Sequence, residues 1–236
     1  WHRAAGWINQ TIPSIVTPGN HEYGKINTGE RALNRNWRPQ FTLPENGVPG
    51  LEETNYYYDV QGVRIISLNS NVKQEEQAQW LDQLLSKNPQ QWTVLTFHHP
   101  IFSTARNRDN KELREAWKPV LDKHNVDLVL TGHDHTYTRS KLMKSDDGKS
   151  GGTIYEVSVG GSKMYDLTER DWMFRRAEDT QLFQVIRING SKLTYEARTA
   201  SGRLYDAFDL EKKSGKKKLI DRTPKDAEIR RPASQQ

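Results

Sequence analysis

The most informative segment of this chain for its fold is Val126-Asp127-Leu128-Val129-Leu130-Thr131-Gly132-His133-Asp134-His135. Its first half is a short apolar run, which predicts a buried strand over residues 126–130. Its second half begins at a glycine and carries two histidines. A buried strand that ends in such side chains is typical of a layered α/β domain, where functional groups gather beyond the carboxyl ends of strands.

Two other segments repeat this arrangement of a strand followed by histidines. The run from Trp92 to Phe97 precedes His98-His99-Pro100, and the β-branched run Ser14-Ile15-Val16-Thr17 precedes Gly19-Asn20-His21-Glu22. Five of the seven histidines lie in these three motifs. Imidazoles, an amide oxygen and nearby carboxylates suit zinc, iron or manganese, so the motifs together predict a metal-assisted hydrolase of phosphate esters.

The segments between and after the motifs support the α/β prediction. Residues 55–60 and 63–68, joined at Gln61-Gly62, predict a β-hairpin, and residues 74–87 and 112–124 predict helices. Residues 1–12 read as the later part of an amphipathic helix, and residues 24–50 as a long ordered insertion near a site. A second, mostly antiparallel sheet is expected from four later segments: 153–159, 182–188, 193–199 and 204–210.

Composition limits the classes of protein that fit. The formal charge is +5, and the run from Lys212 to Lys218 alone contributes five positive charges, so a nucleic-acid surface is not indicated. There are no cysteines, which excludes thiolate metal sites. No stretch of about 18 apolar residues occurs, so no membrane span is expected. Apolar residues become rare after Leu210, which predicts a catalytic domain over residues 1–210 and a basic, disordered tail over 211–236.

The motifs carry specific chemistry, and each has a structural alternative. On an extended segment His133 and His135 point the same way and can hold one metal or address two; the alternative is a pair of exposed loop histidines. Asn20 can offer an amide oxygen to a metal, and His21 can donate a proton to a phosphoryl oxygen; the alternative is a turn residue beside a surface histidine. His98 is either a ligand or a buried core histidine.

Weaker signals surround these residues. His99 can contact substrate or make a structural hydrogen bond, and Arg106 and Arg108 can face a substrate anion or lie on a solvated loop. Asp134 is expected to point away from the metals, and Glu22 to orient a histidine.

In order and spacing, these motifs resemble the last three of the five metal-binding motifs of calcineurin-like metallophosphoesterases. Tyr137 and Arg139, which follow Gly132-His133-Asp134-His135, look like the purple acid phosphatase branch. The resemblance implies the α/β fold of that family, a four-layer α/β/β/α sandwich, here without its first strands. It also implies two metal ions, iron together with zinc, manganese or a second iron, and a hydroxide that they activate to attack phosphorus.

Carried over by motif, Asn20, His98 and His133 would bind the second metal and His135 the first. His21 would be the catalytic residue that hydrogen-bonds the phosphate and helps the leaving group depart, and His99, Arg106 and Arg108 would contact substrate. The family's first two motifs, with the bridging Asp, have no counterpart here. They are expected to precede Trp1, so the sequence is interpreted as an amino-terminally truncated fragment.

These observations predict hydrolysis of phosphomonoesters by the full-length protein, on a small-molecule phosphate ester, outside the cytoplasm in a periplasmic or secreted location. Phosphodiesters and nucleotides remain possible substrates. The alternatives are a catalytically inactive metal-binding or interaction module, and a nuclease or nucleic-acid-binding protein that uses the lysine run.

Overall fold

A computed structural model describes residues 6–25, 31–148, 151–214 and 216–227. Among these residues the helices are α1 (Gly6–Asn9), the 3-10 helix η1 (Asn20–Glu22), α2 (Gln74–Ser86) and α3 (Lys111–Lys123). The strands are β1 (Tyr23–Lys25), β2 (Arg31–Leu33), β3 (Tyr56–Val60), β4 (Val63–Ser67), β5 (Trp92–Thr96), β6 (Leu128–Thr131), β7 (Tyr137–Ser140), β8 (Ile154–Val157), β9 (Met173–Ala177), β10 (Leu182–Asn189), β11 (Lys192–Thr199), β12 (Leu204–Lys213) and β13 (Lys216–Asp221).

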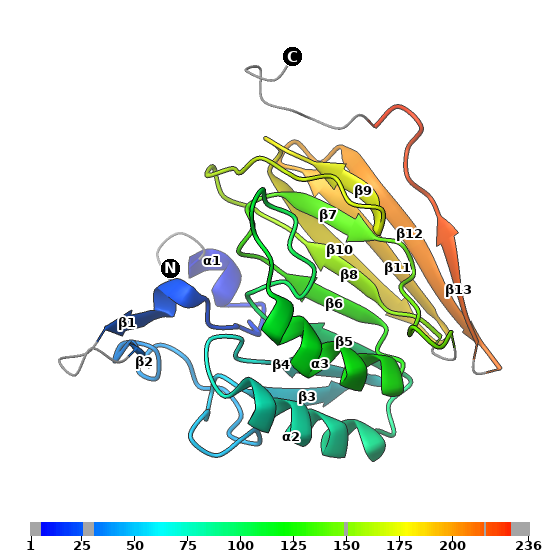
Figure 1. Ribbon diagram of the computed structural model, residues 1–236. Helices are drawn as coiled ribbons and strands as arrows, with labels where there is room; N and C mark the ends of the chain where they lie inside the picture. Colours follow the sequence, from blue (N-terminus) through cyan, green and yellow to red (C-terminus); the bar gives the residue numbers. More distant parts are fainter. Residues whose placement is uncertain (1–5, 26–30, 149–150, 215, 228–236) are drawn as a thin grey trace.

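A seven-stranded sheet, ordered β3-β4-β5-β6-β8-β7-β9, forms the centre of the molecule. Strands β4, β5, β6 and β8 are parallel, and β3, β7 and β9 are antiparallel to their neighbours. Helices α2 and α3 lie side by side on one face of this sheet (Figure 1). Their apolar sides cover the sheet through Leu81, Leu85, Trp117 and Leu121, which are all buried. Since parallel strands need crossover connections, helices on this face are the expected solution.

A four-stranded antiparallel sheet, ordered β10-β11-β12-β13, covers part of the other face (Figure 1). The core between the two sheets contains Tyr137, Ile154, Leu193, Tyr195 and Phe208. The described residues therefore form three layers, α/β/β, of the predicted sandwich. None of the helices among them is long and apolar enough to cross a membrane.

The predicted hairpin, the helices predicted over 74–87 and 112–124, and the later strands are confirmed to within a few residues. The expected place of residues 153–159 in the second sheet is wrong, because their strand, β8, pairs in parallel with β6 in the central sheet. The predicted strand over residues 14–17 is wrong, because the structure assigns no strand there. Side chains hold this segment instead: the Tyr56 hydroxyl donates to the carbonyl oxygen of Val16 at 2.5 Å. Of the amino-terminal helix only α1 is seen, and residues 1–5 lie outside the described residues.

The prediction of disorder from residue 211 is wrong for residues 211–213 and 216–221. Strand β12 continues to Lys213, and Lys216–Asp221 form β13 on its outer edge. The physical reason is a buried carboxylate, Asp127, whose two oxygens lie 2.7 Å from Lys212 Nζ and 2.9 Å from Lys217 Nζ. A lysine-rich segment thus becomes ordered through ion pairing, together with strand pairing to β12 and packing of Leu219 on the core. Residues 228–236 lie outside the described residues.

Candidate metal and phosphate site

The second and third motifs meet because the strands that precede them, β5 and β6, are neighbours and parallel. Strand β4 leads into Ser70, β5 into His98 and His99, and β6 into His133, so the loops project from the same edge of the sheet. The 3-10 turn η1 adds Asn20 from a distant part of the chain. The rule that functional groups lie beyond the carboxyl ends of parallel strands thus accounts for the positions of His98, His99 and His133.

The centre of the site is a cluster of His98, His99, His133 and Asn20, which we call the histidine cluster. His98 Nε2 lies 2.7 Å from Asn20 Oδ1 and 3.0 Å from His133 Nδ1. A ring nitrogen of His99 completes a three-histidine group whose nitrogens all lie within 4.8 Å of one another. The rings of His99 and His133 are only 4.4 Å apart between centroids. One amide oxygen and three imidazoles thus converge on a small volume.

The histidines of this cluster are held neutral. Burial, together with the neighbouring histidines, lowers the pKa of His98 to about 3. Burial also lowers the pKa of His99 to about 4, with contributions from His133 and Arg31, and it lowers that of His133, aided by Arg108. Neutral imidazole is the form that binds a metal ion.

The backbone of the third motif differs from the predicted extended segment. His133 and His135 have φ of +66° and +45°, in the left-handed region that side chains other than Asn and Asp rarely adopt. The segment is therefore not extended, and the common direction of the two side chains no longer follows from strand alternation. His133 faces His98, whereas Nδ1 of His135 lies 2.8 Å from the carbonyl oxygen of Lys163, with its ring beside Tyr165. Left-handed residues of this kind gather at functional sites.

His135 therefore lies next to the histidine cluster without belonging to it. It is near enough to contribute to lowering the pKa of His98 and His133. Its assignment to a first metal stays a prediction. Ser70 fixes the orientation of His99, because its hydroxyl oxygen accepts the His99 backbone N–H at 3.0 Å and lies 2.8 Å from Nδ1.

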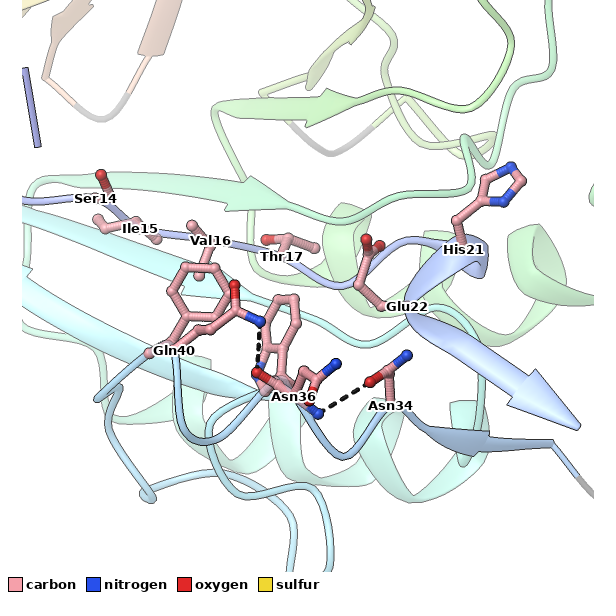
Figure 2. A pocket seen from close by; sticks show the side chains of 11 residues that line it. Ser14, Ile15, Val16, Thr17, His21, Glu22, Asn34, Asn36 and Gln40 are labelled. Atoms are coloured by element: carbon pink, nitrogen blue, oxygen red, sulfur yellow. Dashed lines mark hydrogen bonds between the residues drawn. The ribbon is translucent and has the colours of Figure 1, made fainter. Parts of the chain in front are cut away.

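Gly19, rather than Gly132, is the glycine on which the cluster depends. A Cβ at position 19 would lie 2.9 Å from His98 Nδ1, whereas one at position 132 would meet it at an ordinary 3.9 Å. Glu22 accepts the Gly19 backbone N–H at 2.8 Å, so it fixes the turn and not a histidine as predicted. Figure 2 shows the exposed His21 ring pointing away from Glu22 and Asn34.

The two predicted substrate arginines are placed differently. Asp134 is fully buried and accepts the backbone N–H of Thr104 at 2.6 Å, and its other oxygen pairs with Arg108 at 3.3 Å. Arg108 also reaches the carbonyl oxygen of His133 at 3.4 Å. Arg106 instead pairs with Asp166 at 3.3 Å. The expectation that Asp134 points away from the cluster agrees with these contacts.

Two residues near the site escaped the sequence analysis. Ser70 had no motif around it, although it follows a predicted strand end. Arg31 donates from Nη2 to the Asn20 carbonyl oxygen at 2.8 Å and so braces the loop that carries Asn20. No local pattern in the sequence marks this long-range contact.

The donor set fits a metal ion of the zinc, iron or manganese type. Imidazole nitrogens suit zinc and iron, and an amide oxygen is a common additional ligand for them and for manganese. Three neutral nitrogens and one oxygen, which carry no formal charge, lie together in a half-buried site, and a cation would occupy the space they share. Asn20, His98, His99 and His133 are therefore the residues that could hold it.

Comparison with known proteins assigns the class. A family model described as calcineurin-like phosphoesterase matches residues 2–137, more than half of the chain. The chain belongs to the calcineurin-like phosphoesterase family. Within that family it is similar to purple acid phosphatases, which confirms the resemblance found in the sequence.

Two of the plant relatives are purple acid phosphatase 21 and probable purple acid phosphatase 20 of Arabidopsis thaliana. They are 30% and 34% identical over 66% and 63% of this chain, which spans 38% and 37% of their length. The structure of purple acid phosphatase PPD1 from yellow lupin has the same fold, with a TM-score of 0.67 at 22% identity over 84% of this chain and 40% of that one. The chain thus spans less than half of these proteins.

Proposed function

We propose that the whole protein hydrolyses phosphate monoesters and that the histidine cluster is part of its metal centre. The observation that carries this proposal is the convergence of Asn20, His98 and His133 at the ends of two parallel strands, in a member of the calcineurin-like phosphoesterase family. We further propose that the centre is dinuclear, with iron and zinc, manganese or a second iron, and that His135 contributes to its other half.

Bound metal ions of this kind supply charge for phosphoryl oxygens and lower the pKa of water. Residues of this chain would bind the metal, protonate the leaving group and contact the phosphate. His98 and His133 stay neutral and free to bind because burial opposes their protonation. His21 stands on η1 beside the cluster and, when protonated, donates a proton or a hydrogen bond to the leaving oxygen. Arg108, held by Asp134, would face the phosphate anion.

The proposed substrate is a small phosphate ester, and the proposed location is periplasmic or secreted. Hydrolysis of bis(p-nitrophenyl) phosphate or of a nucleoside monophosphate by the full-length protein would identify the variants of this proposal that act on phosphodiesters or nucleotides. Metal binding without hydrolysis would identify the alternative, a non-catalytic metal-binding module.

The test is hydrolysis of p-nitrophenyl phosphate by the full-length protein, before and after treatment with a chelator. We expect chelation to abolish turnover, and His133→Ala to lower kcat/KM at least a thousandfold, because a metal ligand acts directly on the reacting groups. His124→Ala is the matched control, since His124 pairs with Asp82 at the end of α3 and faces no part of the cluster. Equal activity of the two variants would contradict the proposal.

A further inference from the structure

A polar cavity of about 590 Å³ adjoins the histidine cluster at His99. Its walls come from the first turns of α2 and α3, from Ser70 at the end of β4, and from Arg31 on β2. Because His99 belongs both to the cluster and to this wall, a group that leaves a phosphate at the cluster has direct access to the cavity.

The wall combines hydrogen-bond donors and acceptors. Gln74, half-buried, donates from Nε2 to the Ser70 carbonyl oxygen at 3.1 Å, which fixes its amide at the cavity. The charged lining residues are Arg31 and Lys111 against Glu75, Asp109 and Glu112, so two positive charges face three negative ones. Apart from His99, the lining contains no aromatic ring. A second phosphate would meet a net negative wall, and a nucleobase would find no stacking surface.

We propose that this cavity binds the alcohol part of the substrate and that this alcohol is an uncharged polyol, as in a sugar phosphate or a glycerol phosphate. A hydroxyl both donates and accepts, so several hydroxyls match a wall of carboxylate, amide and guanidinium groups better than an ion or an apolar group does. The inference rests on the proposed phosphatase function and names the substrate class for the same site.

A second cavity, of about 580 Å³ and lined by His21, provides the contrast (Figure 2). Its lining includes Trp37 and Phe41, whose rings are 4.8 Å apart, together with Ile15 and Val16. This cavity suits an aromatic leaving group. The preference of the protein between polyol and aromatic esters therefore shows which cavity receives the leaving group.

The experiment compares kcat/KM for glucose 6-phosphate with kcat/KM for p-nitrophenyl phosphate, using the full-length protein. The double variant Gln74→Ala, Glu112→Ala removes two polar groups from the wall. We expect it to lower the ratio of the two values about tenfold. The matched control is Glu76→Ala, Gln79→Ala, which changes the same residue types on the exposed side of α2, outside the cavity. We expect the control to leave the ratio unchanged.

An unchanged ratio in the double variant would overturn the inference while leaving the proposed function standing. So would a wild-type preference for the aromatic ester that Phe41→Ala abolishes. If the double variant does not fold, Glu112→Ala alone, at an exposed position, makes the same comparison. Failure of the wild-type protein to hydrolyse either ester would overturn the proposed function and, with it, this inference.

Discussion

Two of the buried polar clusters among the described residues differ in how their charges are balanced. Between the two sheets, Arg139 and Asp206 are both fully buried and make two hydrogen bonds of 2.7 Å. Tyr137 donates to the same carboxylate at 2.7 Å. In the histidine cluster, by contrast, neutral imidazoles face one another and an amide oxygen, with no carboxylate among the grouped residues.

The difference separates a structural network from a binding site. Burial alone would raise the pKa of Asp206, but the bonds from Arg139 hold it below its ordinary value, so the pair keeps its charges and supports the fold. Burial lowers the pKa of His98 without any such compensation from an anion. The buried, uncharged ligand atoms of the histidine cluster can therefore bind a cation. In the Arg139–Asp206 network the two charges already balance each other.

Breaking the paired network should have the largest effect on stability. Asp206→Asn leaves Arg139 buried without its main partner, and we expect the free energy of unfolding to fall by about 3 to 5 kcal/mol. Urea denaturation measures this change. Arg38→Ala, which removes the exposed pair with Glu52, should have a much smaller effect, because water and salt screen an exposed pair. Equal losses in the two variants would mean that the buried network is not the stabilising element described above.

The Asp127 pair should show the next largest effect. Lys217→Met removes a side chain that is 4% exposed and pairs with Asp127 at 2.9 Å, so we expect unfolding to become easier by about 3 kcal/mol. Lys218→Met, on the exposed side of β13, is the control. Urea denaturation, with proteolysis at the β13 end as a second readout, compares the two. If they behave alike, β13 is not held by this pair.

Gly19→Ala should weaken zinc binding with little effect on the stability of the fold. Its Cβ would lie 2.9 Å from His98 Nδ1, so the ring must shift, and we expect zinc affinity to fall about tenfold while the free energy of unfolding changes by less than about 2 kcal/mol. Gly161→Ala, where nothing lies within 4 Å of the added atom, is the control for both measurements. Unchanged zinc affinity in Gly19→Ala would show that the His98 ring position does not matter.

The metal-free protein should also show a pair of opposite pH dependences. His98 has a folded pKa of about 3, so below pH 6.5 the unfolded chain binds the proton more tightly, and stability falls as the pH drops from 6.5 towards 3. Burial raises the pKa of Glu156 to about 8, so its contribution is present at low pH and is lost as the pH rises from 4.5 to 8. Each slope is at most about 1.4 kcal/mol per pH unit.

Urea denaturation between pH 5 and 8 measures both slopes. His98→Gln should remove the part of the slope that rises with pH, and Glu156→Gln the part that falls. The reverse pattern, or identical profiles for the two variants, would contradict the assigned directions.

The sequence predicted the elements that local pattern controls and missed those that depend on distant partners. Helices α2 and α3, the hairpin and β5 follow from apolar period and turn residues. Strand β13 did not, because its order depends on a carboxylate about 90 positions earlier in the chain. Asn20, His98 and His133 were predicted from motif order, and the structure places them together.

The remaining parts of the site were beyond local pattern. The left-handed backbone at His133 and His135 cannot be read from a His-x-His spacing, so the predicted extended segment was wrong. Arg31 reaches the site through a hydrogen bond to the backbone carbonyl oxygen of Asn20. Every residue has such a carbonyl group, so the residue type of the partner does not reveal this contact.

Zinc titration monitored by competition with a chromophoric chelator tests the central claim, that the histidine cluster is a metal site. The account predicts that the wild-type protein binds zinc and that His133→Ala weakens binding at least a hundredfold, whereas His124→Ala leaves it unchanged. The same affinity in His133→Ala and in the wild type, or no zinc binding by the wild type, would contradict it.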